Sequence, residues 1–497
     1  MPNAASGRFP AEPQASGLRA TPLRVAAGVV VVVVAAVLLA GLLGGPPPSS
    51  ADITAAASQR ASASASAAAL ASADPDDTAT PGGSQAPDGS QAPGGPPTPG
   101  TTPRTSPGTT AAPSPSSSVP SPVPSDGVPS AALQRRLDKL RAKLSIPGVS
   151  VAILWDDGRQ WLGTSGMADV KAGRPMTTGT AFALASISKT FTAAVVLQLV
   201  EEGKLSLDQR VASLLPAFRL DRRMTVHQLL DHTSGLPDFF LNARIDLPLQ
   251  RAPDATWSAA QTWAYEKKKH PDPGNLWIYS NANYLLLGQL VERVTGHPLA
   301  DEVRSRLIDP LGLESTWYQA EEAPRAQGAV GYRLLLKAGG GLRYLRAAPP
   351  SDVMPFRSVV TAAGGAGSIA ATALDAARWM RAYAGGDVHT PGTRAIQVAD
   401  VATTKALGAS IPYGLGIQAI PVAGHAALGH SGRFLGFRNV ARYLPDEGIT
   451  IAVLTNQGVL DPARIEEALI RIVLPPPAPS ESPMPSPFPS GSPALSP

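Results

Sequence analysis

The chain has 497 residues, of which 42 are Lys or Arg, 38 are Asp or Glu and none is cysteine. Without cysteine, disulfides, thiol catalysis and cysteine-ligated metal sites are excluded. The net charge of +4 is small for this length, and the longest basic run, at residues 267–269, contains no aromatic residue. Nucleic acid is therefore not an expected partner.

An uncharged apolar stretch lies near the N-terminus, at residues 25–43. Its length is close to the roughly 20 residues that a helix needs to cross a bilayer. Three arginines and one acidic residue precede it, so the positive-inside rule places residues 1–24 in the cytoplasm and the rest of the chain outside. The sequence thus predicts a single-pass membrane anchor with an extracytoplasmic domain. A cleaved signal peptide, which would give a secreted protein, is the alternative.

Two tracts rich in Pro, Ser, Ala and Gly divide the rest of the chain. They cover residues 44–130 and 475–497 and contain few large apolar side chains. Such tracts cannot bury enough apolar surface to offset the entropy lost on ordering, so both are predicted to be disordered. The first would act as a tether, and no function is assigned to the second. Residues 131–474, between them, are long enough to form a large core.

The predicted elements of residues 131–474 follow from hydrophobic spacing and turn residues. Leucines at helical spacing open the block, and two apolar runs on either side of an Asp-Asp-Gly turn predict a β-hairpin. In chain order we expect a helix at 133–144, strands at 149–155 and 160–167, a helix at 186–202, mostly helical segments at 205–385, strands near 413–417, 438–444 and 450–456, and a helix at 462–472.

Strands are therefore expected at both ends of this block and helices in its middle. This order predicts an α+β fold, in which both ends of the domain form one antiparallel sheet flanked by helices. The middle of the block would form a mainly helical inserted subdomain.

Several common catalytic signatures are absent from the sequence. There is no HExxH, no GxxxxGK[ST], no GxGxxG after a predicted strand and no GxSxG. The usual zinc hydrolases, nucleotide enzymes and α/β-hydrolases are therefore disfavoured. His227 and His232 are five residues apart and do not share a helix face, so they are not expected to bind one metal ion. We predict neither a metal nor a cofactor.

A serine and a lysine stand three residues apart where the predicted apolar helix begins, in Ser186-Ile187-Ser188-Lys189. On a helix this spacing brings Ser186 and Lys189 within hydrogen-bond reach on one face. A buried lysine loses its proton readily and can then act as the base for a serine nucleophile. The helix N-terminus would favour the developing oxyanion. The alternative is a capping serine beside a lysine whose charged end reaches solvent.

Two further motifs support the catalytic interpretation. Tyr279-Ser280-Asn281 precedes a predicted helix, and Gly429-His430-Ser431-Gly432 precedes the last predicted strands. The three motifs in this order resemble the SxxK, YxN and KTG motifs of the serine β-lactamase and penicillin-binding protein superfamily. The YxN form is similar to that of class C β-lactamases and D-alanyl-D-alanine carboxypeptidases. The resemblance covers essentially all of residues 131–474, and its β-lactamase/transpeptidase-like fold agrees with the predicted α+β arrangement.

The resemblance implies catalytic roles for three side chains. Ser186 would be the acylated nucleophile and Lys189 its proton partner. Tyr279 would serve as second base and as the acid that protonates the leaving group. Asn281 would hydrogen-bond Lys189 and the substrate amide.

The third motif implies a strand that binds the substrate. The backbone N–H groups of Ser186 and Arg433 would form the oxyanion hole, and His430, Ser431 and Gly432 would contact the substrate. His430 stands where β-lactamases usually carry lysine. We expect this histidine to titrate near neutrality and to supply positive charge for a substrate carboxylate only when protonated.

The sequence thus predicts a membrane-tethered serine hydrolase that acts through an acyl-enzyme. The leading expectation is a D-alanyl-D-alanine carboxypeptidase-like peptidase acting on peptidoglycan stem peptides, with β-lactams as covalent ligands. A class C-like β-lactamase, or an esterase or D-aminopeptidase acting on small acyl substrates, is the enzymatic alternative. A penicillin-binding sensor or wall-binding module is the non-enzymatic one.

Overall fold

A computed structural model describes residues 127–266, 271–336, 342–349 and 351–476. The predicted cytoplasmic segment 1–24, the predicted anchor 25–43 and nearly all of both predicted disordered tracts lie outside these residues. The predictions for those segments therefore stay predictions. Within the described ranges, no helix is both long and apolar enough to cross a membrane.

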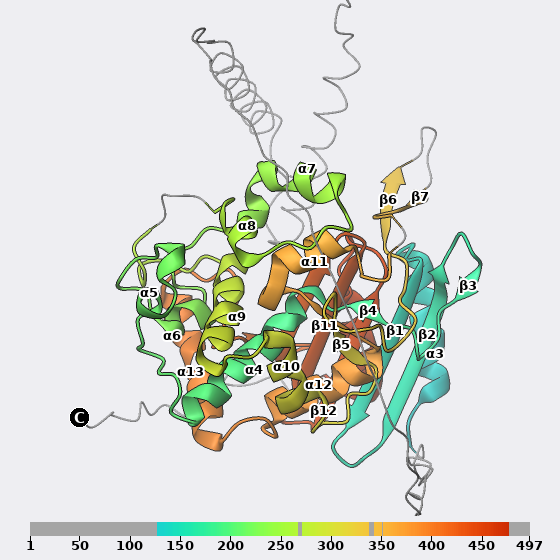
Figure 1. Cartoon of the computed structure of the whole chain (residues 1–497). Coiled ribbons are helices and arrows are strands. Elements are labelled where there is room, and N and C mark those ends of the chain that lie inside the picture. The colour runs from blue at the N-terminus through green and yellow to red at the C-terminus, as the bar shows by residue number, and fades with distance from the viewer. Residues whose placement is uncertain (1–126, 267–270, 337–341, 350, 477–497) are drawn as a thin grey trace, which may run out of the picture. The chain divides into compact units, whose positions relative to one another are not determined.

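In the described part of the chain, both ends of the domain contribute to one seven-stranded antiparallel sheet, as predicted. The first strand pairs with the last, with Ala152 opposite Ala452, so N-terminal and C-terminal strands lie side by side in Figure 1. The strand order is β3 (Arg174–Pro175), β2 (Gln160–Asp169), β1 (Gly148–Trp155), β12 (Ile449–Thr455), β11 (Phe437–Leu444), β10 (Leu428–Phe434) and β9 (Gln418–Ala419).

The two faces of this sheet contribute to two hydrophobic cores. Alternate residues of a strand point to opposite faces. Val151 and Ile153 of β1 accordingly pack with helices α3 (Ser130–Lys143) and α14 (Ala463–Val473). Ala152 and Leu154 belong to the larger core, which contains helix α12 (Ala373–Gly385) and the helical region. This arrangement is the predicted α+β fold.

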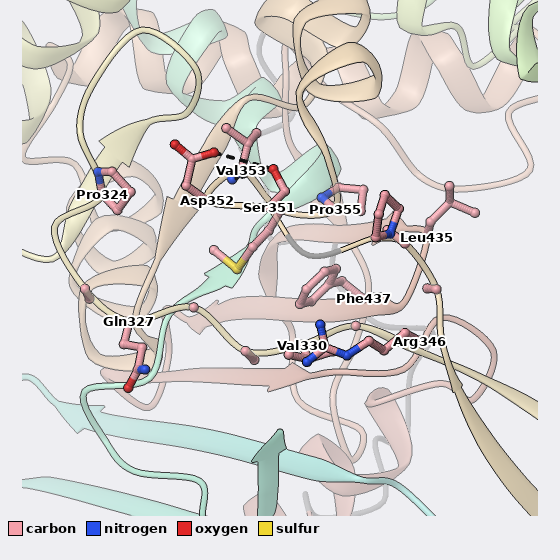
Figure 2. Close-up of a pocket in the computed structure, with 18 of the residues that line it drawn as sticks. Pro324, Gln327, Val330, Arg346, Ser351, Asp352, Val353, Pro355, Leu435 and Phe437 are labelled. Carbon is pink, nitrogen blue, oxygen red and sulfur yellow. Dashed lines mark hydrogen bonds between the residues drawn. The ribbon is translucent and has the colours of Figure 1, made fainter. Parts of the chain in front are cut away.

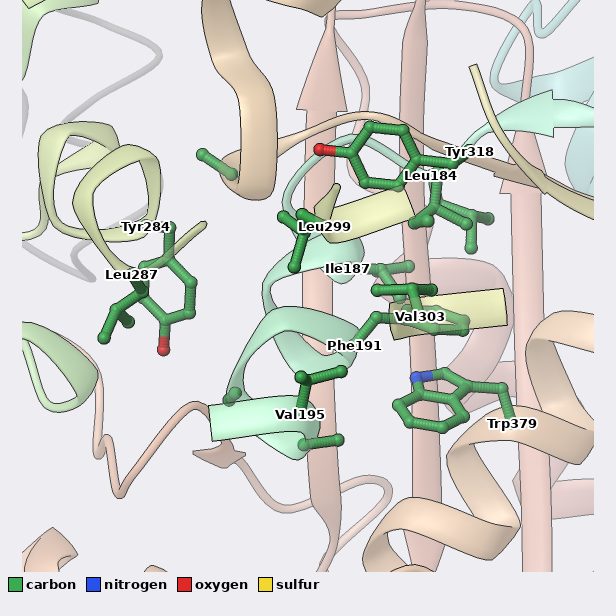
Figure 3. Packing of buried hydrophobic residues seen from close by; sticks show 14 of the residues in the cluster. Leu184, Ile187, Phe191, Val195, Tyr284, Leu287, Leu299, Val303, Tyr318 and Trp379 are labelled. Carbon is green, nitrogen blue, oxygen red and sulfur yellow. The ribbon is translucent and has the colours of Figure 1, made fainter. Parts of the chain in front are cut away.

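The larger core is built around helix α4 (Ser188–Glu201), whose side chains are almost all buried. Phe191 of α4 stacks on Trp379 of α12 with ring centroids 3.9 Å apart, as Figure 3 shows. The other helices are α5 (Val211–Leu214), α6 (Val226–Leu230), α7 (Ala243–Arg251), α8 (Ala259–Trp263), α9 (Asn281–Thr295), α10 (Leu299–Val303), α11 (Arg357–Ala363) and α13 (Pro391–Ala406), with 3₁₀ or π turns η1 (Ala185–Ile187), η2 (Pro216–Phe218), η3 (Phe239–Leu241), η4 (Arg304–Ile308) and η5 (Gly364–Ala366).

One prediction of secondary structure was wrong. The middle region is mostly helical, as predicted, and also contains strands of a small sheet and a hairpin. The segment at 413–417 is not a strand, because Gly416 has a φ of 75° and the Gly414 N–H donates to the Ile417 carbonyl, which makes a turn. The small sheet contains β4 (Phe182–Ala183), β8 (Ile369–Ala371) and β5 (Thr316–Tyr318), and the hairpin contains β6 (Tyr332–Leu336) and β7 (Leu342–Arg346).

Candidate active site

The serine of the first motif lies in a tight turn rather than in the following helix. Ser186 is the middle residue of η1, and α4 begins at Ser188. Ala185 has a φ of 52°, in the left-handed region that non-glycine residues seldom adopt. Such conformations are often found at functional sites, where the surrounding structure holds them. The turn leaves Ser186 partly exposed between α4 and strand β10.

Strand β10 approaches this turn closely because Gly432 has no side chain. A Cβ atom on Gly432 would lie 2.1 Å from the Leu184 carbonyl oxygen and 3.2 Å from the Ser186 nitrogen. Any other residue at this position would therefore displace the strand or the turn. The close approach brings the backbone of the third motif next to the backbone of Ser186.

Lys189 is fully buried on α4, and its ammonium group has three hydrogen-bond partners. Lys189 Nζ donates to Ser186 Oγ at 3.1 Å, to Asn281 Oδ1 at 2.7 Å and to the Ala366 carbonyl at 3.0 Å. Burial lowers the pKa of Lys189 to about 7, although the charge of Asp238 opposes this shift. Near neutral pH a large fraction of Lys189 is therefore uncharged and can accept a proton from Ser186.

Tyr279 lies beside the Ser186–Lys189 pair. Its phenol interacts electrostatically with Ser186, and Lys189 Nζ lies 5.2 Å from the centre of its ring. Burial is the main cause that raises the pKa of Tyr279 above its ordinary value. The phenol thus keeps its proton at neutral pH, which suits a group that gives a proton to a leaving group.

Asn281 is the first residue of α9 and connects Lys189 to a carboxylate. Its Oδ1 accepts from Lys189, and its Nδ2 donates to Asp238 Oδ2 at 2.7 Å. Asp238 precedes η3, and its Oδ1 accepts from the Phe240 N–H at 2.9 Å. Because burial raises the pKa of Asp238 while Lys189 and its hydrogen bonds lower it, this carboxylate is electrostatically linked to the lysine.

His430 does not behave as the sequence led us to expect. Its ring is fully buried, Nδ1 lies 2.6 Å from the Ser431 carbonyl, and Nε2 lies 2.9 Å from the Tyr413 hydroxyl. A carbonyl only accepts, so Nδ1 carries the proton and Nε2 accepts from Tyr413. Burial, with the nearby charges of Lys189 and Arg442, lowers the pKa of His430 well below its ordinary value. The expectation that His430 titrates near neutrality was therefore wrong.

Ser431 points to the opposite face of β10 and is held by a buried amide. Both the N–H and the hydroxyl of Ser431 donate to Gln418 Oε1, at 3.1 Å and 3.3 Å. Gln418 also accepts from Arg442 Nη2 at 2.9 Å, and both side chains are buried. Gln418 thus links the Ser431 hydroxyl to the positively charged guanidinium of Arg442.

A cavity of about 730 Å³ opens onto Ser186 and Asn281. Its apolar wall includes Leu249 and Phe356, and Arg433 contributes a guanidinium. Its charged side chains are Asp238, Asp246, Arg333 and Arg433. The cavity is large enough for a short peptide or a β-lactam and offers both signs of charge next to the serine.

A second cavity, of about 310 Å³, lies behind Leu435, a residue that lines both cavities. Figure 2 shows Arg346, Ser351 and Asp352 in its wall. None of the motif residues lines this cavity. The chemistry of the site therefore belongs to the larger cavity.

Comparison with protein families agrees with this geometry. The family model described as "Beta-lactamase" matches residues 133–474, which is well over half of the chain. The chain belongs to the β-lactamase family. The match begins and ends within a few residues of the boundaries expected for the folded block, and it includes all three motifs of the β-lactamase-type site.

Among curated relatives, penicillin-binding protein 4 from Amycolatopsis lactamdurans is 32% identical over 342 residues, covering 66% of this chain and 85% of that protein. A D-aminopeptidase from Cereibacter sphaeroides is 29% identical over 343 residues, covering 65% of this chain. The chain spans only 60% of the length of that second relative. These β-lactamase-family relatives are serine hydrolases, and so is this chain.

Among solved structures, D-amino acid amidase from Ochrobactrum anthropi SV3 superposes with a TM-score of 0.59 at 24% identity. The superposition covers 69% of this chain and 97% of the amidase. At this identity the likeness shows the fold alone. It supports the antiparallel sheet and helical region of a β-lactamase/transpeptidase-like enzyme.

The structure brings together Ser186, Lys189, Tyr279 and Asn281, and places Gly432 and Arg433 beside them. Sequence reasoning missed Asp238, because this residue belongs to none of the three motifs. It also missed Gln418 and Arg442, since neither belongs to a recognisable motif. Their effect on Ser431 depends on strand register, which pairs Gly429 with both Gln418 and Arg442.

Proposed function

We propose that this chain is a membrane-tethered, extracytoplasmic D-alanyl-D-alanine carboxypeptidase-like enzyme that acts on peptidoglycan stem peptides through an acyl-enzyme on Ser186. The main support is that Lys189 and Tyr279 lie next to Ser186, which lines a cavity that also contains Arg433. The match to a penicillin-binding protein supports the same substrate class.

In the proposed acylation step, Ser186 Oγ attacks the carbonyl carbon of the penultimate D-alanine. The hydroxyl proton passes to neutral Lys189 Nζ, 3.1 Å away. The oxyanion is stabilised by the N–H groups of Ser186 and Arg433, which the absence of a side chain at Gly432 allows to approach each other.

Collapse of the tetrahedral intermediate requires a proton on the leaving amine. Tyr279 is the proposed donor, because its raised pKa keeps the phenol protonated and its hydroxyl already interacts with Ser186. The Lys189 ammonium can then return a proton to Tyr279. The C–N bond breaks, D-alanine leaves, and water later hydrolyses the ester on Ser186.

The terminal carboxylate of the substrate needs a positive partner, and His430 does not supply one. Arg433 follows the third motif directly, is exposed and lines the cavity. Arg333 lies in the same wall. We therefore assign carboxylate recognition to Arg433, while His430 and Ser431 support the strand through their own hydrogen bonds.

The predicted anchor at 25–43 and tether at 44–130 complete this proposal. A flexible chain of about 85 residues has a root-mean-square span of roughly 50 Å. This reach would let a membrane-bound enzyme act on wall peptides away from the bilayer surface. The alternative of a cleaved signal peptide would give the same catalytic domain without the tethered location.

The test is release of D-alanine from an acyl-L-Lys-D-Ala-D-Ala peptide by the full-length protein. Arg433→Gln should lower kcat/KM for this peptide at least tenfold and change hydrolysis of a neutral p-nitrophenyl ester less than twofold. Arg343→Gln, which changes an exposed arginine of β7 that lines none of the cavities described above, is the matched control. Equal loss on both substrates would contradict the carboxylate assignment.

One observation favours a second candidate, a D-amino acid amidase or aminopeptidase. The Asp238 carboxylate lines the same cavity as Ser186 and could pair with the ammonium of an uncapped D-amino acid amide. A D-aminopeptidase is among the relatives. Faster turnover of D-alanine amide than of the capped peptide, lost in Asp238→Asn, would establish this alternative.

A further inference from the structure

Three metal-ligating side chains meet outside the active site. His227 lies in α6, Asp231 directly follows α6, and Asp400 lies in α13. His227 Nε2 is 3.0 Å from Asp400 Oδ1 and 3.9 Å from Asp231 Oδ2. One ligand atom from each side chain falls within 4.8 Å of the others.

The cluster places two buried carboxylates beside each other with only a histidine to balance them. Asp231 is 2% exposed and Asp400 is 7% exposed. Within the described ranges, neither forms an ion pair with a lysine or arginine; their recorded ionic partner is His227. The two carboxylates therefore lack positive charge that a bound cation would supply.

A separate observation is that one carboxylate oxygen of Asp400 is an unsatisfied hydrogen-bond acceptor among the described residues. Its Oδ2 is buried and has no hydrogen-bond partner in the described part of the chain. A buried carboxylate oxygen without a partner is strongly unfavourable. The ring of His227 is 33% exposed, so a small ion can reach the cluster from solvent.

We propose that His227 Nε2, Asp231 Oδ2 and the Asp400 carboxylate bind a divalent transition-metal ion such as Zn²⁺, with water in the remaining position. Imidazole and carboxylate are ordinary Zn²⁺ ligands at about 2.0–2.2 Å, which places tetrahedral ligands about 3.4 Å from one another. The separations of 3.0 Å and 3.9 Å lie on either side of this value. Small side-chain rotations would complete the site.

The surrounding contacts fit a metal site that holds two helices together. Thr233 Oγ1 donates to Asp231, at 2.7 Å and 2.9 Å to its two oxygens, and so orients this carboxylate as outer ligands do. Asp231 precedes His232, whose ring lies 4.3 Å from that of Tyr279. The bound ion would therefore link α13 to the turn that follows α6, and this turn lies next to Tyr279. This makes the site structural, because His227 and Asp400 do not line the catalytic cavity.

The test is Zn²⁺ binding to the metal-stripped, full-length protein without a polyhistidine tag, measured by isothermal titration calorimetry. We expect one ion per chain with a dissociation constant of micromolar or tighter. Asp400→Asn, which preserves side-chain shape, should weaken binding at least tenfold, and His227→Ala should abolish it. His297→Ala is the control, because His297 pairs only with Glu302 among the described residues.

Co²⁺ provides a second readout that reports on the ligands themselves. In the wild type it should give the visible absorption of a tetrahedral ion, and in Asp400→Asn this absorption should be lost or shifted. Zn²⁺ should also raise the melting temperature of the wild type by at least about 3 °C, but not that of His227→Ala. Absence of binding in the wild type, or binding unchanged in both variants, would overturn the proposal.

Discussion

The amine nitrogen of Lys189 lies 3.1 Å from the hydroxyl oxygen of Ser186, and no solvent reaches the lysine. This relationship makes the pair a chemical unit, because burial removes the charge that would otherwise prevent the lysine from accepting a proton. Helical spacing provides the contact, while the packing around α4 provides the low polarity. Both properties are needed for a serine to become a nucleophile near neutral pH.

The pH dependence of acylation should report Lys189. The pKa of Lys189 is about 7, so the neutral form increases as the pH rises through 7. We expect the acylation rate constant to rise with an apparent pKa near 7 and to level off above it, because Tyr279 keeps its proton there. Stopped-flow acylation by a chromogenic β-lactam measures this rising limb of the pH profile. A profile that is flat from pH 5.5 to 9 would contradict the role of Lys189 as base.

Asp238→Asn should shift the same limb. The charge of Asp238 raises the pKa of Lys189, so its removal should move the limb to lower pH and change the plateau rate less than tenfold. Asparagine can still accept the hydrogen bond from Asn281. Asp246→Asn is the matched control, since Asp246 lines the same cavity but is exposed on α7. Identical shifts in both variants would show that Asp238 has no specific role.

Gly432→Ala should damage the site through its backbone. The new Cβ would meet the Leu184 carbonyl at 2.1 Å, so β10 must move away from the Ser186 turn. We expect acylation to fall at least a hundredfold and the free energy of unfolding to fall by roughly 1–3 kcal/mol. Chemical denaturation and acylation kinetics measure the two effects. Gly392→Ala in α13, where a Cβ meets nothing within 4 Å, should leave acylation unchanged.

His430 should remain neutral across the working range of the enzyme. Burial, Lys189 and Arg442 all lower its pKa, and both ring nitrogens are hydrogen-bonded in the Nδ1-protonated form. Selective ¹⁵N labelling of histidine should therefore show a His430 ring with constant shifts from pH 5.5 to 8. A midpoint within this interval would restore the sequence-based expectation that His430 supplies pH-dependent charge to the substrate.

Local signals in the sequence predicted that Ser186 and Lys189 lie in contact, as they do in the structure. The three-residue spacing of Ser186 and Lys189 needs only a helix to bring the side chains together, and the hairpin at 149–167 needs only a turn and two apolar runs. The pairing of the first and last strands followed from their positions at both ends of the block. These features depend on residues that are close in sequence or on the order of the elements along the chain, and both can be read from the sequence.

Other features depend on tertiary contacts and could not be predicted. The ionisation of His430 is set by its burial and by the charge of Lys189, which is distant in sequence. Asp238 reaches Lys189 only through Asn281, which lies 43 residues further along the chain. The segment 413–417 has strand-like residues, but its two glycines allow the turn that the core requires.

The most direct test of the central claim is intact-mass analysis of the full-length protein after reaction with benzylpenicillin. Ring opening by Ser186 should add the whole mass of the β-lactam once per chain, and peptide mapping should place it on Ser186. Ser188→Ala should still be labelled, because the Ser188 hydroxyl only accepts a backbone hydrogen bond from Ile369. Ser186→Ala should gain no mass. An adduct that persists in Ser186→Ala, or one that maps to Ser188 or to another residue, would contradict the account.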